Sequence, residues 1–170
     1  ISILKSAGIE VISGVLKEEA AYQNRAFIYR VKKGRAWGVL KWAMSLDGRT
    51  ALPNGQSKWI SHLNAREWVY KLRAKSDAVV TGGQTVRADD PLLTTRGLSS
   101  PEPLRVVLSN SLNLPKDAQL WETSIAKTLI VHSATSNKSR LDELSKKAET
   151  LSLEKSEPIQ LLEALARRGC

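Results

Sequence analysis

The sequence has few of the residues that build covalent or metal-bound scaffolds. It contains one cysteine, Cys170, and two histidines, His62 and His132. A single cysteine excludes an internal disulfide framework and a cysteine-based zinc site, and it fits a reducing compartment. The two histidines lack the spacing of metal ligands, so no metal is expected. A G-x-S-x-G nucleophile pattern is also missing, which argues against that class of hydrolase.

Long apolar runs are absent as well, and acidic residues are outnumbered. No stretch of this sequence approaches the roughly 20 apolar residues that cross a bilayer, so no membrane association is expected. The 26 lysines and arginines against 17 acidic residues give a net charge of +9. That excess suits an anionic partner such as a phosphorylated metabolite, a dinucleotide or a nucleic acid, although a solvated basic surface has the same composition.

What is present is an alternation of short apolar strands and helical patterns within 170 residues, a length typical of one domain. Strands are predicted at residues 9–15, 37–43, 77–81, 104–108 and 128–132. Helices are predicted at residues 2–7, 18–31 and 62–75, around 85, over the stripe 141–151 and over 161–165. This alternation predicts an α/β fold, a mostly parallel sheet with helices on both faces.

Ligands of open α/β sheets bind outside the carboxyl ends of the strands. These ends are predicted at residues 43–48, 81–85 and 108–110, where polar residues cluster. Gly82 and Gly83, between a strand and a helix, either let backbone N–H groups approach an anion or form a plain turn. The full G-x-G-x-x-G pattern is absent, so this motif does not decide between the two.

Several charged residues are candidates for ligand contacts. Asp89 and Asp90 are adjacent acceptors that suit ribose hydroxyls, although a helix end with a solvated turn explains them equally well. Arg96 has the planar guanidinium that matches phosphate, and Arg73 either binds an anion or interacts with the helix dipole. Lys41 stands in a predicted apolar strand, where burial without an anionic partner is costly, and this favours a functional lysine.

The long polar loop ends in a hydroxyl close to an indole. Ser57 can hold a polar group while the ring of Trp59 packs on a flat ligand, although tryptophan more often anchors a core.

Taken in order, these motifs resemble the reductase domain of the bifunctional pyrimidine deaminase/reductase of riboflavin biosynthesis. The stretches that carry the resemblance are Lys41–Arg49, Ser57–Ile60, Leu72–Arg73, Thr85 and Asp89–Arg96. Their shared order and spacing is more specific than any one of them. The stretch from Leu112 to Trp121 is most similar to plant and cyanobacterial members.

The resemblance implies a dihydrofolate-reductase-like fold, NADPH as cofactor and 5-amino-6-(5-phosphoribosylamino)uracil as the substrate whose ribosyl group is reduced to ribityl. It implies cofactor contacts by Ala43, Trp59, Thr85, Asp89 and Asn110, and it gives the turn at Gly82 and Gly83 a cofactor phosphate to bind. It implies substrate contacts by Ser57, Arg73, Leu93 and Arg96. Lys41 matches a lysine near the reacting sugar, and we expect Lys41 or Asp89 to assist ring opening or proton delivery.

The resemblance also predicts a domain arrangement. Residues 1–24 are expected to be the tail of a preceding deaminase-like domain, 25–34 the end of a linker helix, and 35–170 the reductase domain without its C-terminal part. The N-terminal Ile1 and the helix stop before Cys170 favour a piece of a longer protein. A homodimer is expected, in the plastid stroma if the source is a plant and otherwise in the cytoplasm.

Three other interpretations stay open. The chain could be another oxidoreductase of the same fold acting on a different pteridine or pyrimidine, or a catalytically inactive domain that binds a partner. A basic nucleic-acid-binding module is the third, and it is disfavoured because the arginines lack interleaved aromatics and any known reader motif. The favoured interpretation requires Ser57, Arg73, Thr85 and Asp89 to converge on one rim of the sheet.

Overall fold

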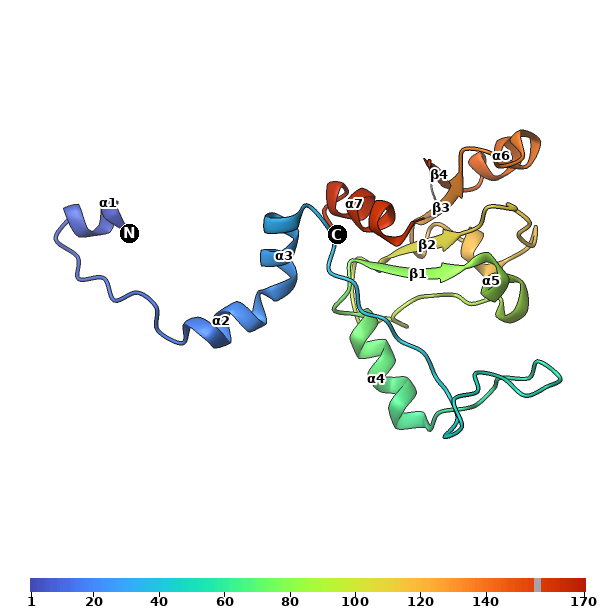
Figure 1. Cartoon of the computed structure of the whole chain (residues 1–170), viewed down its shortest axis with the longest axis horizontal. Helices are drawn as coiled ribbons and strands as arrows, with labels where there is room; N and C mark the ends of the chain where they lie inside the picture. The colour runs from blue at the N-terminus through green and yellow to red at the C-terminus, as the bar shows by residue number, and fades with distance from the viewer. Residues whose placement is uncertain (155–156) are drawn as a thin grey trace.

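The computed structural model describes residues 1–154 and 157–170. They form a four-stranded parallel sheet with helices on both faces, preceded by an extended N-terminal arm (Figure 1). This confirms the predicted α/β class. In chain order the elements are α1 (Ser2–Ser6), α2 (Lys17–Gln23), α3 (Arg25–Lys33), α4 (Leu63–Arg73), β1 (Ala78–Gly82), α5 (Gly83–Asp89), β2 (Leu104–Leu108), the 3-10 helix η1 (Gln119–Trp121), β3 (Thr128–Ser133), α6 (Lys138–Ser145), β4 (Glu149–Leu153) and α7 (Pro158–Arg167).

The strands lie in the order β1-β2-β3-β4, so each strand pairs with the next along the chain. The register places Val80 opposite Val106, and Val107 opposite Ile130. Parallel neighbours need a crossover, and α5, η1 and α6 lie on the successive connections. Within the described residues β1 is an edge strand, with Val80 43% exposed.

The sheet has a core on each face because alternate strand residues point to opposite sides. One core contains Val106, Leu129 and Val131, packed with Leu161 and Leu165 of α7. The other contains Val107 and Ile130, packed with Val86 of α5, Leu120 of η1 and Leu144 of α6. Burying an aliphatic side chain of this size stabilises a fold by about 1.5–3 kcal/mol, so β2 and β3 hold the domain together.

The last helix fixes the start of the sheet domain. Pro158 stands in the first turn of α7, where a missing N–H costs nothing, and Leu161 and Leu165 lie on the buried face. The Ala36 N–H donates to the Leu162 carbonyl at 2.9 Å, and Arg35 pairs with Glu163 at 3.1 Å. The chain therefore joins the sheet domain at Arg35 and Ala36, immediately before the first predicted central strand.

The stripe over residues 141–151 predicts one helix, and its second half is wrong. Helix α6 ends at Ser145, and Glu149–Leu153 is the strand β4 beside β3. Leu151 and Leu153 alternate with polar residues, which is the period of a strand, and this signal was masked because Leu144, Ala148 and Leu151 also fit a helical spacing.

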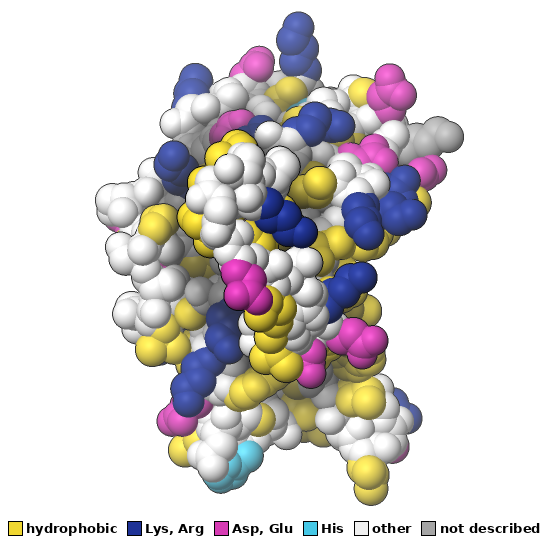
Figure 2. All heavy atoms as spheres, turned by 90° about the vertical axis from the view of Figure 1, so that its left-hand side faces the viewer, with side chains coloured by type: hydrophobic (Ala, Val, Ile, Leu, Met, Phe, Trp, Pro, Cys, Tyr) yellow, Lys and Arg dark blue, Asp and Glu magenta, His cyan; other side chains and the backbone are white. Residues whose placement is uncertain are grey.

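Two predicted strands are not formed. Residues 9–15 and 37–43 are irregular, and Leu40 is 83% exposed. An extended segment needs a neighbour for its backbone hydrogen bonds, and none joins residues 37–43 to the rest of the described chain. The helix predicted over 18–31 is also divided, since α2 ends at Gln23 and α3 begins at Arg25. Figure 2, seen from the side of the N-terminal arm, shows apolar side chains exposed among lysines and arginines.

The remaining predicted elements are confirmed. The strands at 77–81, 104–108 and 128–132 correspond to β1, β2 and β3, and the helices at 2–7, 62–75, 85 and 161–165 correspond to α1, α4, α5 and α7. None of the helices described here is both long and apolar enough to cross a membrane.

Candidate functional site

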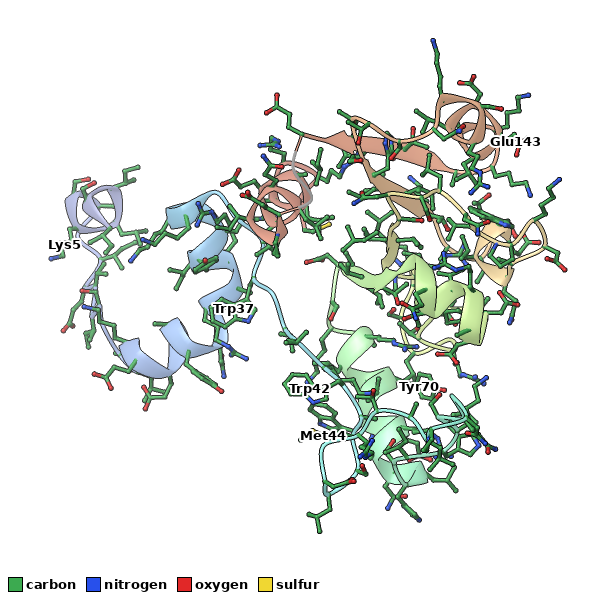
Figure 3. All side chains as sticks on the ribbon, turned by 45° about the vertical axis from the view of Figure 1, so that its right-hand side comes forward. Lys5, Trp37, Trp42, Met44, Tyr70 and Glu143 are labelled. Atoms are coloured by element: carbon green, nitrogen blue, oxygen red, sulfur yellow. The ribbon has the colours of Figure 1, made fainter. Side chains whose placement is uncertain are left out.

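Two of the predicted substrate-binding arginines come together beside α4. The guanidinium carbon Cζ of Arg73 lies 5.7 Å from the centre of the Tyr70 ring, and that of Arg96 lies 5.1 Å from the same centre. Tyr70 projects from α4 (Figure 3), and Arg73, three residues further along the helix, shares its face. One aromatic ring therefore gathers guanidinium groups from a helix and from a distant loop.

The electrostatics of this cluster favour an anion. Burial is the main cause of a lowered pKa of the Arg73 guanidinium; Tyr70 opposes that shift and the positive charge of Arg96 adds to it. Neither arginine forms an ion pair with a carboxylate of the described residues. Two neighbouring cations without a counter-charge repel each other. A phosphate would relieve this repulsion, because the planar guanidinium group can bond two phosphate oxygens at once.

The loop after α5 holds this cluster in place. Arg73 Nη1 donates to the Thr94 carbonyl at 3.3 Å. Leu93 and Arg96 have left-handed backbones, with φ of 55° and 56°, which few non-glycine residues adopt. The Leu93 side chain is only 6% exposed, so this predicted substrate contact anchors the loop in the interior.

Ser57 and Trp59 lie just before α4. The Arg66 guanidinium stacks 4.3 Å from the centre of the Trp59 ring, and its Nη1 donates to the Ser61 carbonyl at 2.6 Å. The tryptophan is 69% exposed even so. Trp59 is therefore no core anchor, and its ring remains accessible to a planar ligand.

The carboxyl ends of β1 and β2 carry the predicted cofactor residues. Gly82 is the last residue of β1, opposite Leu108, and Gly83 begins α5. A Cβ atom on Gly83 would lie 2.8 Å from Ser109 Oγ, whereas a Cβ on Gly82 meets nothing within 4 Å. Gly83 is therefore required for packing α5 against the end of β2, which is the plainer of the two interpretations of this turn.

One buried hydroxyl at this rim is available to a ligand. Ser109 Oγ is buried and has no hydrogen-bond partner among the described residues, although nearly all such atoms in proteins are paired. Thr85, in the first turn of α5, is exposed, and the Asn110 carbonyl accepts a hydrogen bond from Ser136 Oγ at 2.8 Å. The ends of β1, β2 and β3 thus form one polar edge.

The two adjacent aspartates have different roles. Asp90 has a left-handed φ of 40° and accepts hydrogen bonds from the backbone and side-chain nitrogens of Gln119, at 2.9 and 3.2 Å, which ties the end of α5 to η1. Asp89 is exposed, and its side chain makes no hydrogen bond with another described residue. Of this pair Asp89 is the carboxylate that can meet a ligand.

The burial predicted for Lys41 is wrong. Lys41 lies in the irregular segment, not in a buried strand, and its side chain is exposed. Ala43 is half-buried in the same segment, where Trp42 Nε1 donates to Met44 Sδ at 3.2 Å (Figure 3). Because Lys41 has no burial cost to offset, its assignment depends on the family resemblance alone.

The predicted residues other than Lys41 and Ala43 fall into three groups. The rim group is Gly82, Gly83, Thr85, Asp89 and Asn110; the arginine group is Arg73, Leu93 and Arg96; and the loop group is Ser57 and Trp59. The chain after α5 joins the first group to the second, and α4 joins the second to the third. No hydrogen bond between described residues links Ser57 to Thr85 or Asp89, and none links Lys41 or Ala43 to any of the three groups.

Two surface hollows are lined by none of these residues. One, of about 670 Å³, lies between the loop 112–116 and α6, and the other, of about 640 Å³, lies beside Asp77, Glu102 and the chain end. The described residues contain no cluster of three histidine, cysteine or carboxylate groups that suits a metal ion.

Sequence reasoning missed Tyr70 and Ser109. Tyr70 is three residues before Arg73 on a predicted helix, so its spacing could have revealed it. The isolation of Ser109 Oγ depends on the packing of α5 against β2, and nothing in the local sequence announces it.

The fold and these groups define the class: an open parallel α/β domain, of the kind that binds ligands outside the carboxyl ends of its strands. Residues 36–170 match the RibD C-terminal domain, and the chain belongs to that family.

Individual relatives agree with this assignment. The riboflavin biosynthesis protein RibD of Synechocystis sp. is 46% identical over 171 residues, which cover 100% of this chain and 46% of that protein. The chloroplastic riboflavin biosynthesis protein PYRR of Arabidopsis thaliana is 38% identical over 177 residues, 98% of this chain and 30% of that protein. The chain thus spans less than half the length of these relatives.

A solved structure supports the fold. The crystal structure of a diaminohydroxyphosphoribosylaminopyrimidine deaminase/5-amino-6-(5-phosphoribosylamino)uracil reductase from Thermotoga maritima has a TM-score of 0.82 and 31% identity, and it covers 98% of this chain and 46% of that one. The similarity bears out the expectation of a dihydrofolate-reductase-like fold.

Proposed function

We propose that this chain is the reductase domain of a riboflavin-biosynthesis enzyme and that it reduces 5-amino-6-(5-phosphoribosylamino)uracil with NADPH. Membership of the RibD C-terminal domain family supports the pathway and the reductase class. The substrate assignment depends on one observation, the pair Arg73 and Arg96 on the Tyr70 ring. This substrate has a phosphate that can bind two cations without a counter-charge.

The polar rim fits a nicotinamide dinucleotide. Gly82 leaves open space for a backbone approach, and the unpartnered Ser109 Oγ can bond a polar group of the cofactor. Thr85, Asp89 and Asn110 would bind it from the same edge, and Trp59 offers a ring to a planar group. When bound, the cofactor supplies the hydride.

In the proposed reaction the ribosyl ring first opens. The bond between C1 and the ring oxygen breaks, the oxygen takes the proton of the glycosidic N–H, and C1 becomes doubly bonded to nitrogen. A hydride then adds to C1 and a proton to the nitrogen, which gives the ribityl chain and the oxidised cofactor. Arg73 and Arg96 hold the phosphate so that C1 is fixed in place. Asp89 and Lys41, both exposed, are the proposed proton carriers.

The test is NADPH consumption by the natural full-length protein. We expect consumption only when the phosphoribosyl pyrimidine is present, with a ribityl product. Arg73→Met and Arg96→Met should each raise KM for this substrate about 10- to 100-fold, because a charge-assisted hydrogen bond contributes about 1.5–3 kcal/mol. Arg167→Met, at an exposed position in the last turn of α7, is the matched control and should leave KM unchanged.

The dephosphorylated substrate sharpens this test. With the ribosyl pyrimidine the two arginine variants should match the unmodified protein, since there is no phosphate to lose. If NADPH is consumed only with another pteridine or pyrimidine, the protein is a different oxidoreductase. If the substrate binds without turnover, the domain is inactive. Lys41→Met and Asp89→Asn should lower kcat, and a variant with unchanged kcat loses its proposed role.

We also propose a location and an oligomeric state. The PYRR relatives of maize and Arabidopsis are chloroplastic, which supports the plastid stroma for a plant source, with the cytoplasm as the proposal for any other. A homodimer is proposed from the family resemblance, and sedimentation of the full-length protein tests it.

A further inference from the structure

The turn that carries Arg96 has an unusual backbone. Arg96 has a φ of 56° and Gly97 a φ of 84°, so consecutive residues adopt the left-handed conformation. For a side chain as large as arginine this conformation is unfavourable, and it persists only where the surroundings hold it. Arg96 itself is exposed, so the restraint comes from the residues on either side of it.

The carboxylate of Glu102 supplies that restraint. Its Oε2 accepts from the Thr95 N–H at 2.6 Å, and its Oε1 accepts from the Thr95 hydroxyl at 2.8 Å and from the Gly97 N–H at 3.4 Å. The donors are the neighbours of Arg96 in the chain, one on each side. Thr95 is fully buried and Glu102 is half-buried, so the two bonds between them are partly shielded from water.

The negative charge of Glu102 is stabilised by its surroundings. Partial burial opposes its ionisation, but the bonds from Thr95 and Gly97 and the positive charge of Arg105 outweigh burial and lower the pKa of Glu102. Arg105 is fully buried in β2, where its Nη2 donates to the carbonyls of Glu122 and Ala126 at 2.9 and 2.5 Å. Arg105 therefore places a fixed positive charge near Glu102 without forming an ion pair or hydrogen bond with it among the described residues.

The same turn also orients the second arginine. The carbonyl of Thr94, the residue before the restrained turn, accepts the hydrogen bond from Arg73 Nη1. Thr94 is 4% exposed and cannot move without disturbing the buried side chains around it. Both guanidinium groups on the Tyr70 ring thus depend on the backbone that Glu102 holds.

We propose that Glu102 is a positioning residue: its carboxylate fixes the turn from Thr95 to Gly97, so that Arg96 and Arg73 face a ligand phosphate together. The inference rests on the proposed function insofar as that phosphate belongs to the substrate. Glu102 touches no ligand. It acts through the two arginines, and its loss should weaken phosphate binding without altering the cofactor.

The decisive variant is Glu102→Gln, which keeps the shape and removes the charge and an acceptor for Thr95 and Gly97. In the full-length protein we expect KM for the phosphoribosyl pyrimidine to rise about tenfold, with KM for NADPH and kcat each within about threefold. Glu122→Gln is the matched control, because Glu122 also interacts electrostatically with Arg105 but its carboxylate accepts from Ser124 and not from the turn. It should leave all three constants unchanged.

A binding measurement separates this proposal from the proposed function. Titration calorimetry with ribose 5-phosphate needs no turnover, and Glu102→Gln should raise its Kd about tenfold. The unmodified protein could have no reductase activity while Glu102→Gln still raises the Kd of ribose 5-phosphate. In that case the proposed reaction is wrong and the positioning role stands. If reductase activity is present and Glu102→Gln keeps the original KM and Kd, or if ribose 5-phosphate does not bind the unmodified protein, the positioning role is overturned.

Two further variants guard against misfolding. Thr95→Val removes the hydroxyl bond to Glu102 and the acceptor of the Ser99 N–H at 3.2 Å, but it keeps the backbone bond from Thr95 to Glu102. It should raise KM by a smaller factor than Glu102→Gln, so it serves if Glu102→Gln does not fold. In an Arg96→Met background Glu102→Gln should raise KM by a smaller factor than it does in the unmodified protein, because only Arg73 is then left to position. Fully independent effects of the two changes on KM contradict the proposal.

Discussion

The two parts of this molecule use apolar residues in opposite ways. Among residues 1–62, Ala36 is the one buried residue, and side chains such as Ile3 and Leu40 are more than 80% exposed. In the part that follows, Val106, Leu129 and Ile130 are fully buried in a parallel sheet. The contrast shows that an apolar run is buried only where partner strands and helices lie on both sides of it, as they do for β2 and β3.

A pair of leucine truncations tests this contrast, and it has the largest expected effect. Leu129→Ala in β3 should lower the free energy of unfolding by about 2–5 kcal/mol, because it removes packed methyl groups and leaves a cavity. Leu40→Ala should change it by less than about 0.5 kcal/mol, as expected for an exposed position. Urea unfolding measures both. Equal losses would show that residues 37–43 are packed in solution.

A glycine pair tests the comparison at the junction of β1 and α5. Gly83→Ala should cost about 1–3 kcal/mol, the usual range for overpacking, because the new Cβ would lie 2.8 Å from Ser109 Oγ. Gly82→Ala, one residue earlier, has open space around it and should be tolerated. Thermal unfolding of the two variants decides the matter, and a tolerated Gly83→Ala would mean that α5 can move away from β2.

How far the sequence predicts the fold depends on which elements supply a strand's neighbours. The strands β1, β2 and β3 follow one another in order, so local patterns located them correctly. Residues 37–43 have an equally apolar pattern but no neighbour among the described residues, and the pattern alone could not reveal this. The strand β4 was missed because a helical spacing of leucines overlapped its alternation.

A third, smaller effect concerns pH. The pKa of Glu102 is lowered in the folded chain from its ordinary value of 4.5, so its contribution to stability is present above that value and is lost as pH falls through the lower folded pKa. Unfolding free energies measured by urea at a series of acidic pH values should therefore fall less steeply for Glu102→Gln than for the unmodified chain. Parallel curves would show that Glu102 is not held as described.

The smallest expected effect lies at the junction of the two parts. Arg35 and Glu163 pair at 3.1 Å with about a third of each side chain exposed. Glu163→Gln should cost less than about 1 kcal/mol, the usual range for exposed pairs, and less still at high salt. Urea unfolding at low and high salt measures this. A larger loss would mean that the attachment of Arg35 to α7 supports the whole sheet.

The candidate site was predicted in part. Arg73, Arg96 and Asp89 were proposed from residue type and the family resemblance, and the structure gives the two arginines a shared ring. The roles of Glu102 and Asp90 were not foreseen, because each depends on hydrogen bonds to a loop that folds back from elsewhere in the chain. Lys41 was argued from a burial that does not occur.

The edge position of β1 has a consequence for the rim. Its five residues, Ala78–Gly82, include no charge and no proline, the features by which sheet margins usually repel an incoming backbone. The outer side of β1 is thus a template for a further extended segment. Such a segment, if it ran in the same direction, would finish beside Gly82 and add its own side chains to the ligand-facing border, so whatever docks there also completes one wall of the candidate site.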